Sequence, residues 1–479
     1  VPSPSPAPPP PAQRLDRRAW AVLLVLSGAA FLEGVDISMM GVALPSIRAD
    51  LDLSTSALQW VVSAYVVGYG GFVLLGGRAA DLLGRRRMFL LWLGVFVAFS
   101  GLGGLATEGW MVIVARFVTG VAAGFMTPAA LSIITTTFAE GPARNRALLV
   151  YAGTGAAGFS LGLVVGGLLT AVHWRWTFFA PVLLAAALLA AAPRVLPRAE
   201  RIAGVAARRQ FDLAGALTVT GAALLLVLGV VRAPDAAIGT TVATLAASAV
   251  ALAAFVAIER RAAAPLVRLG ILRSAALVRA NVGIALFFGS FVGFQFIAVL
   301  YLQELRGWSP LETGLALLVV GSDAILAPTV TPWLVARWGN GRVLFVGMVA
   351  ALVGYALFLP VGADWAYAAM LPTLVLTGFA FALAYGPLMI MATDGVDEAE
   401  QGLAGGLFSV SVQFGAALGL AAVTAVNVAA TGPDGSPEAL LDGYRTALLV
   451  PVAATAVGAL VAATGLRRRA LSPAAAPAG

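Results

Sequence analysis

Two carboxylates lie within one long apolar stretch near the start of the sequence. Residues 19–47 contain no charged side chains except Glu33 and Asp36, which are three positions apart and so share one face of a helix. A carboxylate at the centre of a membrane helix costs about 2.5–3.5 kcal/mol. Burial favours the neutral form of such a group, and one of two neighbouring carboxylates can keep the other protonated. The pair is therefore a candidate site for holding and releasing a proton.

Two more charged residues occupy apolar segments. Arg116 could tune the protonation of a nearby carboxylate, or it could bond to helix-end carbonyls or extend to the outer surface. Asp323 could recognise a cation, or it could bond to Ser322 or to a backbone group. We expect Pro328 to break the helix just beyond Asp323, which would open a cavity.

Composition indicates where these residues must work. The chain of 479 residues is 60% hydrophobic and 11% charged, with a mean hydropathy of +0.94, whereas soluble domains carry about 25% charged residues. This composition predicts an integral protein of the lipid bilayer. The net charge of +7 comes from arginines that punctuate apolar segments, which argues against a nucleic-acid partner. With no cysteine and one histidine, no disulfide, metal site or cofactor is expected.

Fourteen apolar segments are long enough to cross about 30 Å of hydrocarbon. With the N-terminus inside, 24 of the 30 arginines fall in cytoplasmic segments and 5 in outer loops, while Arg116 lies within a span. This bias predicts an even number of spans and two cytoplasmic termini. The segments cover residues 19–47, 56–77, 88–107, 110–138, 147–172, 175–193, 212–232, 236–258, 277–303, 311–336, 342–361, 364–392, 402–429 and 443–465.

The loop after the second segment carries a motif. GGRAADLLGRRRMF, residues 76–89, fits the pattern G-x-x-x-D-x-x-G-R-R. Its acid can pair with an arginine in a tight cytoplasmic turn, and its glycines allow helices to approach closely. The alternative is an ordinary arginine-rich cytoplasmic loop. The fixed positions are Gly77, Asp81, Gly84, Arg85 and Arg86.

With this loop, the sequence resembles the major facilitator superfamily. VDISMMGVALP (35–45), LQWVVSAYVV (58–67) and YLQELRGWSPLETG (301–314) are similar to signatures of its fourteen-helix drug:proton antiporters. TPWLVARWGNGR (331–342) looks like a degenerate second copy of the loop motif, in which Ala336 replaces the acid. The resemblance covers about residues 15–466 and identifies the branch, not the substrate.

The resemblance implies an all-α polytopic membrane protein with the major facilitator fold and 14 transmembrane helices. Six-helix bundles at 19–193 and 271–466 would enclose a site near the bilayer midplane. Residues 194–270 would hold cytoplasmic linkers and two inserted helices. Residues 1–18, which are rich in proline, would form a disordered cytoplasmic tail, and 467–479 a second cytoplasmic tail.

Two further family motifs involve a cation and a glycine stripe. In ARFVTGVAAG (115–124), Thr119 stands where the family has glutamine after the arginine. In GTGAAGFSLGLVVGGLL (153–169), small residues recur every four positions, and Leu163 replaces a family proline. Close helix packing and a special coupling role are both compatible with the stripe. Its glycines are Gly158, Gly162, Gly166 and Gly167.

The leading expectation is proton-coupled efflux of a lipophilic, cationic drug or antibiotic across the bacterial cytoplasmic membrane, by a protein that functions as a monomer. Asp36 matches the helix 1 acid of the branch, and Glu33 would share its proton. A proton gradient would supply the energy because no Walker motif is present. We expect an adaptable, mostly apolar cavity. Its predicted lining comprises Gln59, Trp60, Tyr65, Met39 and Met40.

Two alternatives remain open. A proton symporter or facilitator with the same fold would import a small organic solute, but such solutes require several polar groups in the cavity. Few occur within the spans, which favours a lipophilic substrate (Gln59, Gln295, Gln413 and Asn427). A non-transporting membrane sensor would need a soluble domain to read out its signal. An enzyme is not expected because no cluster of nucleophile, base and orienting group can be assembled.

Overall fold

All regular secondary structure in the described part of the computed structural model is helical, as expected. Most of the predicted tails and of the linkers around the inserted helices lies outside the described residues. The first helix begins at Arg17 and the last helix includes Leu471. The described residues of both predicted tails are therefore helical. The structure describes residues 17–138, 142–197, 212–231, 237–262, 265, 269–394, 396, 401–432 and 436–471.

The first half of the chain forms six helices, which follow one another along the chain in the order of the predicted apolar segments. Helix α1 packs mainly on α5 and α6, while α2 packs on α4, and α3 on α4 and α6. These helices are α1 (Arg17–Leu51), α2 (Thr55–Leu83), α3 (Arg85–Gly104), α4 (Gly109–Thr137), α5 (Pro142–Val172) and α6 (Trp176–Val195).

The second half repeats this arrangement with more interruptions. Its ninth predicted span includes a π-helical end, and its tenth is divided by a 3₁₀ segment. The elements are η2 (Leu269–Arg273), α9 (Ala275–Leu300), η3 (Tyr301–Leu305), α10 (Pro310–Leu317), η4 (Leu318–Ser322), α11 (Asp323–Trp338), α12 (Asn340–Phe358), α13 (Tyr367–Thr393), α14 (Gln401–Thr431), α15 (Pro437–Ala447) and α16 (Leu449–Leu471).

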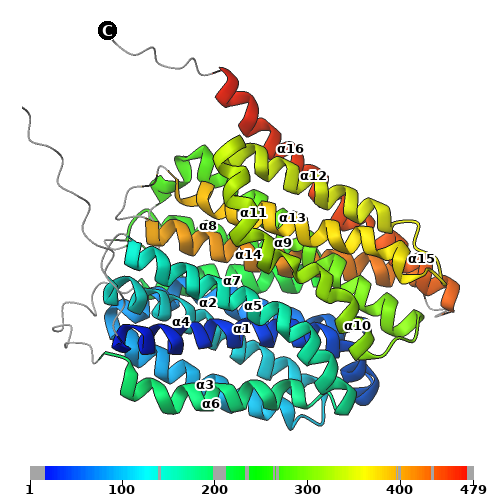
Figure 1. The fold of residues 1–479 in the computed structure, drawn as a ribbon, viewed down its shortest axis with the longest axis horizontal. Coiled ribbons are helices and arrows are strands. Elements are labelled where there is room, and N and C mark those ends of the chain that lie inside the picture. The colour runs from blue at the N-terminus through cyan, green and yellow to red at the C-terminus, as the bar shows by residue number, and fades with distance from the viewer. Residues whose placement is uncertain are drawn as a thin grey trace, which may run out of the picture.

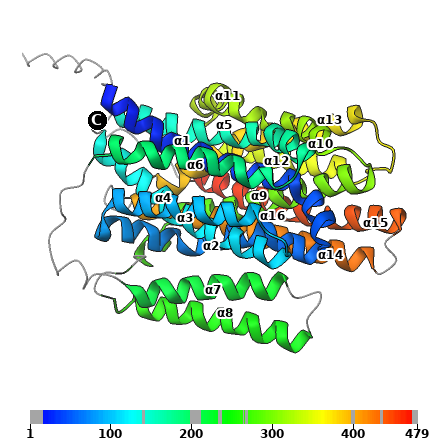
Figure 2. The same ribbon diagram turned by 90° about the horizontal axis from the view of Figure 1, so that it is seen from below.

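The two halves lie side by side with their helices roughly parallel, the first half in blue to green-cyan and the second in yellow-green to red (Figure 1). Between them in sequence, α7 (Leu213–Val231) and α8 (Ile238–Glu259) form a hairpin on one flank (Figure 2). Helix α7 contacts both α2 and α14. The Thr220 hydroxyl donates to the Gly71 carbonyl at 2.6 Å, so the hairpin is fastened to the first half.

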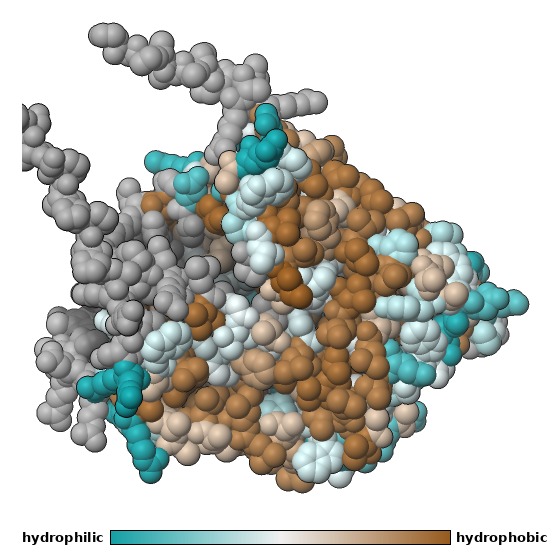
Figure 3. Space-filling view, in the orientation of Figure 1, coloured by the Kyte–Doolittle hydropathy of each residue, from teal (hydrophilic) through white to brown (hydrophobic). Residues whose placement is uncertain are grey.

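Thirteen described helices or helix runs are long and apolar enough to cross a membrane, and they coincide with thirteen of the fourteen predicted spans. The one remaining predicted span, 212–232, corresponds to α7. The apolar part of this helix is the shorter stretch Ala214–Leu226. Hydrophobic residues form a broad band across the molecule, with hydrophilic residues gathered toward its two ends (Figure 3). The band is the surface that a bilayer would cover.

Two chain reversals have the same backbone geometry. Gly84 joins α2 to α3 with φ of +100°, and Gly339 joins α11 to α12 with φ of +80°. Glycine adopts such angles without steric cost, whereas other residues are strained there. The degenerate second copy of the loop motif therefore keeps the turn.

The helix break near Asp323 lies on the other side of that residue from the predicted one. The 3₁₀ segment η4 ends at Ser322, and α11 then runs without interruption from Asp323 to Trp338. The prediction that Pro328 breaks the helix is wrong. The irregular turn instead places Asp323 in the first turn of an α-helix, where the helix dipole favours a carboxylate.

Candidate proton-coupling and substrate site

Asp36 of α1 forms a buried ion pair with Arg116 of α4. Arg116 Nη1 lies 2.6 Å from Asp36 Oδ2, and the two residues are 2% and 1% exposed. Arg116 Nε also donates to the Val61 carbonyl of α2 at 3.3 Å, and the guanidinium lies 4.3 Å from the centre of the Tyr65 ring. Arg116 therefore does not extend to the surface. It joins three helices around one carboxylate.

Glu33, one turn earlier on α1, has a different kind of partner. Both of its carboxylate oxygens accept from the Thr127 hydroxyl of α4, at 2.8 and 2.9 Å. The Tyr69 hydroxyl of α2 lies 2.9 Å from the same Thr127 oxygen. Within the described part of the chain, no ion pair involves Glu33. A hydroxyl network, not a counter-ion, surrounds this acid.

The two acids thus belong to separate networks. No hydrogen bond between Glu33 and Asp36 occurs among the described residues, so the structure does not show the shared proton that their spacing predicted. The networks adjoin each other through α2, where the rings of Tyr65 and Tyr69 pack edge to face with centroids 6.2 Å apart. Each network links α1, α2 and α4, and they differ in whether a cation is present.

Glycines on α2 and α4 bring these helices close enough for both networks. A Cβ at Gly120 would collide with the Tyr65 carbonyl, and a Cβ at Gly68 would collide with the Phe117 carbonyl. Thr119, in the position of the family glutamine, is buried and donates to the Arg116 carbonyl at 3.0 Å. These small residues therefore hold α2 and α4 close together, at the level where Arg116 reaches the Val61 carbonyl.

The helix 5 glycines serve two different interfaces. Gly158, Gly162 and Gly166 pack directly on α1, where an added Cβ would meet the backbone of Phe31, Val35 and Met39 respectively. Gly167 instead faces the second half, because its Cβ would come within 2.7 Å of the Pro310 carbonyl oxygen. The stripe thus holds the acid-bearing helix in place, and its last glycine contacts α10.

We expect Gly158→Ala to destabilise the protein by about 1–3 kcal/mol, since the added methyl group has no space against Phe31. Gly153→Ala on the same helix is the matched control. Its Cβ would meet no atom within 4 Å, and alanine is favoured over glycine in a helix by about 1 kcal/mol. Thermal unfolding of the two purified variants in detergent measures the difference. Equal midpoints would contradict close packing at Gly158.

The loop motif is only partly as expected. Arg86 donates to the Pro193 carbonyl at 2.7 Å and so ties α3 to the end of α6, while Arg85 reaches the Ser132 carbonyl at 3.5 Å. A Cβ at Gly77 would make only ordinary contact with α4, whereas one at Gly76 would collide with it. Close approach thus depends on the neighbouring glycine. The Asp81 side chain, and with it the predicted pairing, lies outside the described residues.

A central cavity of about 120 Å³ lies between the halves. Its described walls come from α1, α2 and α5 on one side and from α9, α10 and α14 on the other. None of the five predicted lining residues is among them. Met39, Met40, Gln59 and Tyr65 are buried in helix packing, because α1 turns Ile37, Ser38 and Gly41 toward the cavity instead. Trp60 is partly buried against a neighbouring apolar cluster.

Asp323 does not line this cavity. It is half-buried, and no ion pair involving it occurs in the described part of the chain. The structure therefore separates this acid from both the Asp36 and the Glu33 networks.

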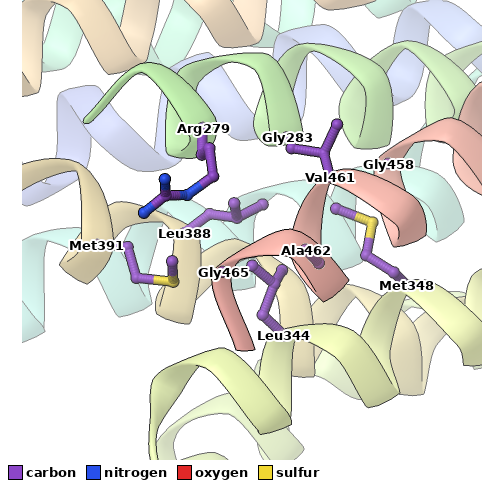
Figure 4. A pocket seen from close by; sticks show the side chains of 10 residues that line it. All are labelled: Arg279, Gly283, Leu344, Met348, Leu388, Met391, Gly458, Val461, Ala462 and Gly465. Carbon is purple, nitrogen blue, oxygen red and sulfur yellow. The ribbon is translucent and has the colours of Figure 1, made fainter. Parts of the chain in front are cut away.

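A second cavity lies inside the second half, between α9, α12, α13 and α16 (Figure 4). Arg279 and Met391 stand at one end of it and Met348 at the other. Its volume of about 10 Å³ leaves room for roughly one water molecule. This space is too small for an organic substrate, so the central cavity is the candidate substrate site.

The halves are fastened together at the end of the molecule where α1 ends and α9 ends. Arg48 Nη1 bonds to both oxygens of Glu304, at 2.8 and 2.9 Å. The neighbouring Gln303 amide donates to the Val42 carbonyl at 2.9 Å. In this conformation the first and second halves are therefore joined on the side predicted to face outward.

The family follows from comparison with known proteins. A family model of the Major Facilitator Superfamily matches residues 26–420. The chain belongs to the major facilitator superfamily. It is accordingly a multi-pass membrane transporter, and its resemblance to the drug and antibiotic exporters of that superfamily is confirmed by its relatives.

Two relatives of this superfamily member are antibiotic export or resistance proteins. The cephamycin export protein CmcT of Amycolatopsis lactamdurans is 35% identical, over 90% of this chain and 89% of that protein. The puromycin resistance protein pur8 of Streptomyces alboniger is 35% identical, over 93% of this chain and 90% of that protein. Among solved structures, an autoinhibited POT family peptide transporter aligns with a TM-score of 0.68 at 16% identity, over 96% of this chain and 99% of that one. That likeness shows the fold alone.

Sequence reasoning missed Thr127 and Tyr69 of the Glu33 network. A signal was present, since Thr127 follows Arg116 by eleven residues, which is three helical turns, and Tyr69 follows Tyr65 by four. It also missed Phe288 and Phe291 in the cavity wall. Their segment is apolar on all sides, so no periodicity distinguishes a cavity face from a packing face.

Proposed function

We propose that this transporter exports lipophilic small molecules, an antibiotic among them, across the bacterial cytoplasmic membrane in exchange for protons. The relatives named for cephamycin export and puromycin resistance support the direction and the substrate type. The observation that carries the proton step is the unequal environment of two acids on one helix, Glu33 beside a hydroxyl and Asp36 beside a guanidinium.

In this mechanism Glu33 carries the proton. Burial without a counter-ion favours a neutral carboxylic acid, whereas an ion pair favours a charged one. Asp36 is therefore assigned a structural role, pairing with Arg116 and holding α1 on α4, while Glu33 takes up and releases the proton. This reverses the sequence-based assignment, in which Asp36 was the coupling residue and Glu33 its partner.

Coupling to the substrate follows from the position of Glu33 on α1. Ile37 lies one turn further along the same helix and lines the central cavity. A substrate in the cavity and a proton on Glu33 therefore act on the same helical segment. Each charge that crosses the membrane contributes about 2.3 kcal/mol per 100 mV, so the proton gradient suffices as energy source without a cofactor.

The proposed topology places both termini in the cytoplasm. The beginning of α1 and the end of α16 lie toward the same end of the molecule (Figure 1), which fits an even number of crossings. The arginine bias assigns that end to the inside. The cavity and both acid networks lie within a single chain, so we propose a functional monomer.

Transport in proteoliposomes tests this function. The purified full chain is reconstituted, a pH gradient is imposed, and movement of puromycin and of protons is recorded together. We expect puromycin to move against the proton flow and a protonophore to stop its accumulation. Accumulation in the same direction as the protons would instead establish a symporter, and transport that is independent of the gradient would establish a facilitator.

A further inference from the structure

The walls of the central cavity carry no charged side chain among the described residues. Three polar side chains line it, namely Ser38, Gln295 and Gln413. The Ser38 hydroxyl already donates to the Gly34 carbonyl of its own helix at 3.0 Å. The two glutamine amides are thus the main polar groups that a bound molecule would meet.

Gln295 has an unused donor. Its Nε2 atom is buried and has no hydrogen-bond partner in the described part of the chain. A buried amide N–H that lacks a partner is costly, so such groups usually face a ligand or water. Because Gln295 lines the cavity, an acceptor atom of a bound molecule would satisfy it.

Aromatic rings form the apolar part of the wall. Phe291 lies at the centre of this group, with ring centroids 6.3 Å from Phe159 and 6.0 Å from Phe288. Phe381 packs behind it at 4.9 Å and stacks on Tyr385 at 5.4 Å with an interplanar angle of 9°. The rings come from both halves of the transporter, so a flat molecule would contact α5 and α9 at once.

The three acids discussed above do not line the central cavity. Asp36 is 1% exposed and its charge is balanced by Arg116. Glu33 is bonded to Thr127 of α4, and Asp323 is not part of the wall. A cation in this cavity would lose its hydration without gaining a counter-charge from the described walls.

We propose that the central cavity binds an uncharged, aromatic, lipophilic molecule with an acceptor oxygen or nitrogen, which Gln295 recognises by donating a hydrogen bond. This inference rests on the proposed export function and specifies its substrate class. It departs from the cationic substrate expected from Asp323, because no described side chain of the wall offers a cation a counter-charge.

Binding of two fluorescent probes to the purified full chain in nanodiscs tests the proposal, with empty nanodiscs subtracted. Nile red is neutral, flat and bears a carbonyl, whereas ethidium is a flat cation. We expect Nile red to bind the wild type more tightly than ethidium does. Gln295→Leu, which keeps a similar volume, should weaken Nile red binding about tenfold. Asp323→Asn should leave both affinities unchanged.

A second variant, which is expected to gain affinity for one probe, controls for misfolding of Gln295→Leu. Gln295→Glu introduces a carboxylate into the wall and should strengthen ethidium binding while weakening Nile red binding, a result that an unfolded protein cannot produce. Tighter ethidium binding to the wild type, or unchanged Nile red affinity in Gln295→Leu, would overturn the proposal. Binding is measured without a gradient, so its outcome is independent of whether proton-coupled transport is found.

Discussion

Replacing Glu33 by glutamine is expected to abolish proton-driven accumulation while exchange of substrate across the membrane continues. The amide matches the acid in shape and can still bond to Thr127, so the fold should survive. It cannot release a proton. With an imposed difference of about 2 pH units, one proton per substrate can support roughly 100-fold accumulation, since one unit is about 1.36 kcal/mol. The variant should reach a ratio of about one.

The measurement compares uphill accumulation with counterflow in the same proteoliposomes. Counterflow exchanges labelled for unlabelled substrate and needs no net proton movement. It therefore reports whether the protein still binds substrate and still exposes its site to each side of the membrane in turn. Glu438→Gln, at an exposed position on α15, is the matched control and should behave as wild type. Wild-type accumulation by Glu33→Gln would remove Glu33 from the proton path.

Asp36→Asn is expected to cause a large loss of stability. The change leaves the Arg116 guanidinium buried without a counter-charge, and removal of one partner of a buried pair costs about 3–5 kcal/mol. The double variant Asp36→Asn/Arg116→Gln removes both charges and should recover much of this loss. Thermal unfolding of the purified proteins and the yield of monodisperse protein measure both effects.

An exposed ion pair provides the comparison for this variant. Asp442 and Arg445 are 3.4 Å apart, with side chains 71% and 40% exposed. Asp442→Asn makes the same chemical change there and should alter the unfolding midpoint very little, because exposed pairs contribute about 0–1 kcal/mol. If Asp36→Asn were as stable as Asp442→Asn, the buried pair would not be a structural link between α1 and α4.

Charged residues in apolar segments were the most informative part of the sequence. Asp36 and Arg116 lie eighty positions apart, yet each required a partner at membrane depth, and the resemblance to drug exporters placed their helices in one half. The positions of the spans were also predictable, because hydropathy depends on local composition alone. What could not be predicted was which partner each acid has, because that depends on how deeply α4 sits against α1.

The cavity was less predictable than the helices. Met39 and Met40 are flexible apolar residues of the kind that line adaptable sites, but the rotation of α1 buries both and turns Gly41 inward. Apart from Glu33 and Asp36, the middle of α1 is apolar on nearly all sides, so hydrophobic periodicity does not determine this rotation. Small residues determine it here, since Gly162 and Gly166 of α5 receive the backbone of α1.

The placement of two of the cross-helix ion pairs described above bears on how fast the molecule can turn over. The buried Asp36–Arg116 pair lies wholly within one half, so a movement of one half against the other would leave it intact. The pair between the halves, Arg48–Glu304, is 33% and 18% exposed, and water can replace each partner as it separates. At about 1 kcal/mol it biases the closed arrangement roughly fivefold and does not arrest it. A buried ion pair between the halves would impose a barrier on every transport cycle. The buried pair described here instead lies within one half, where no separation is needed.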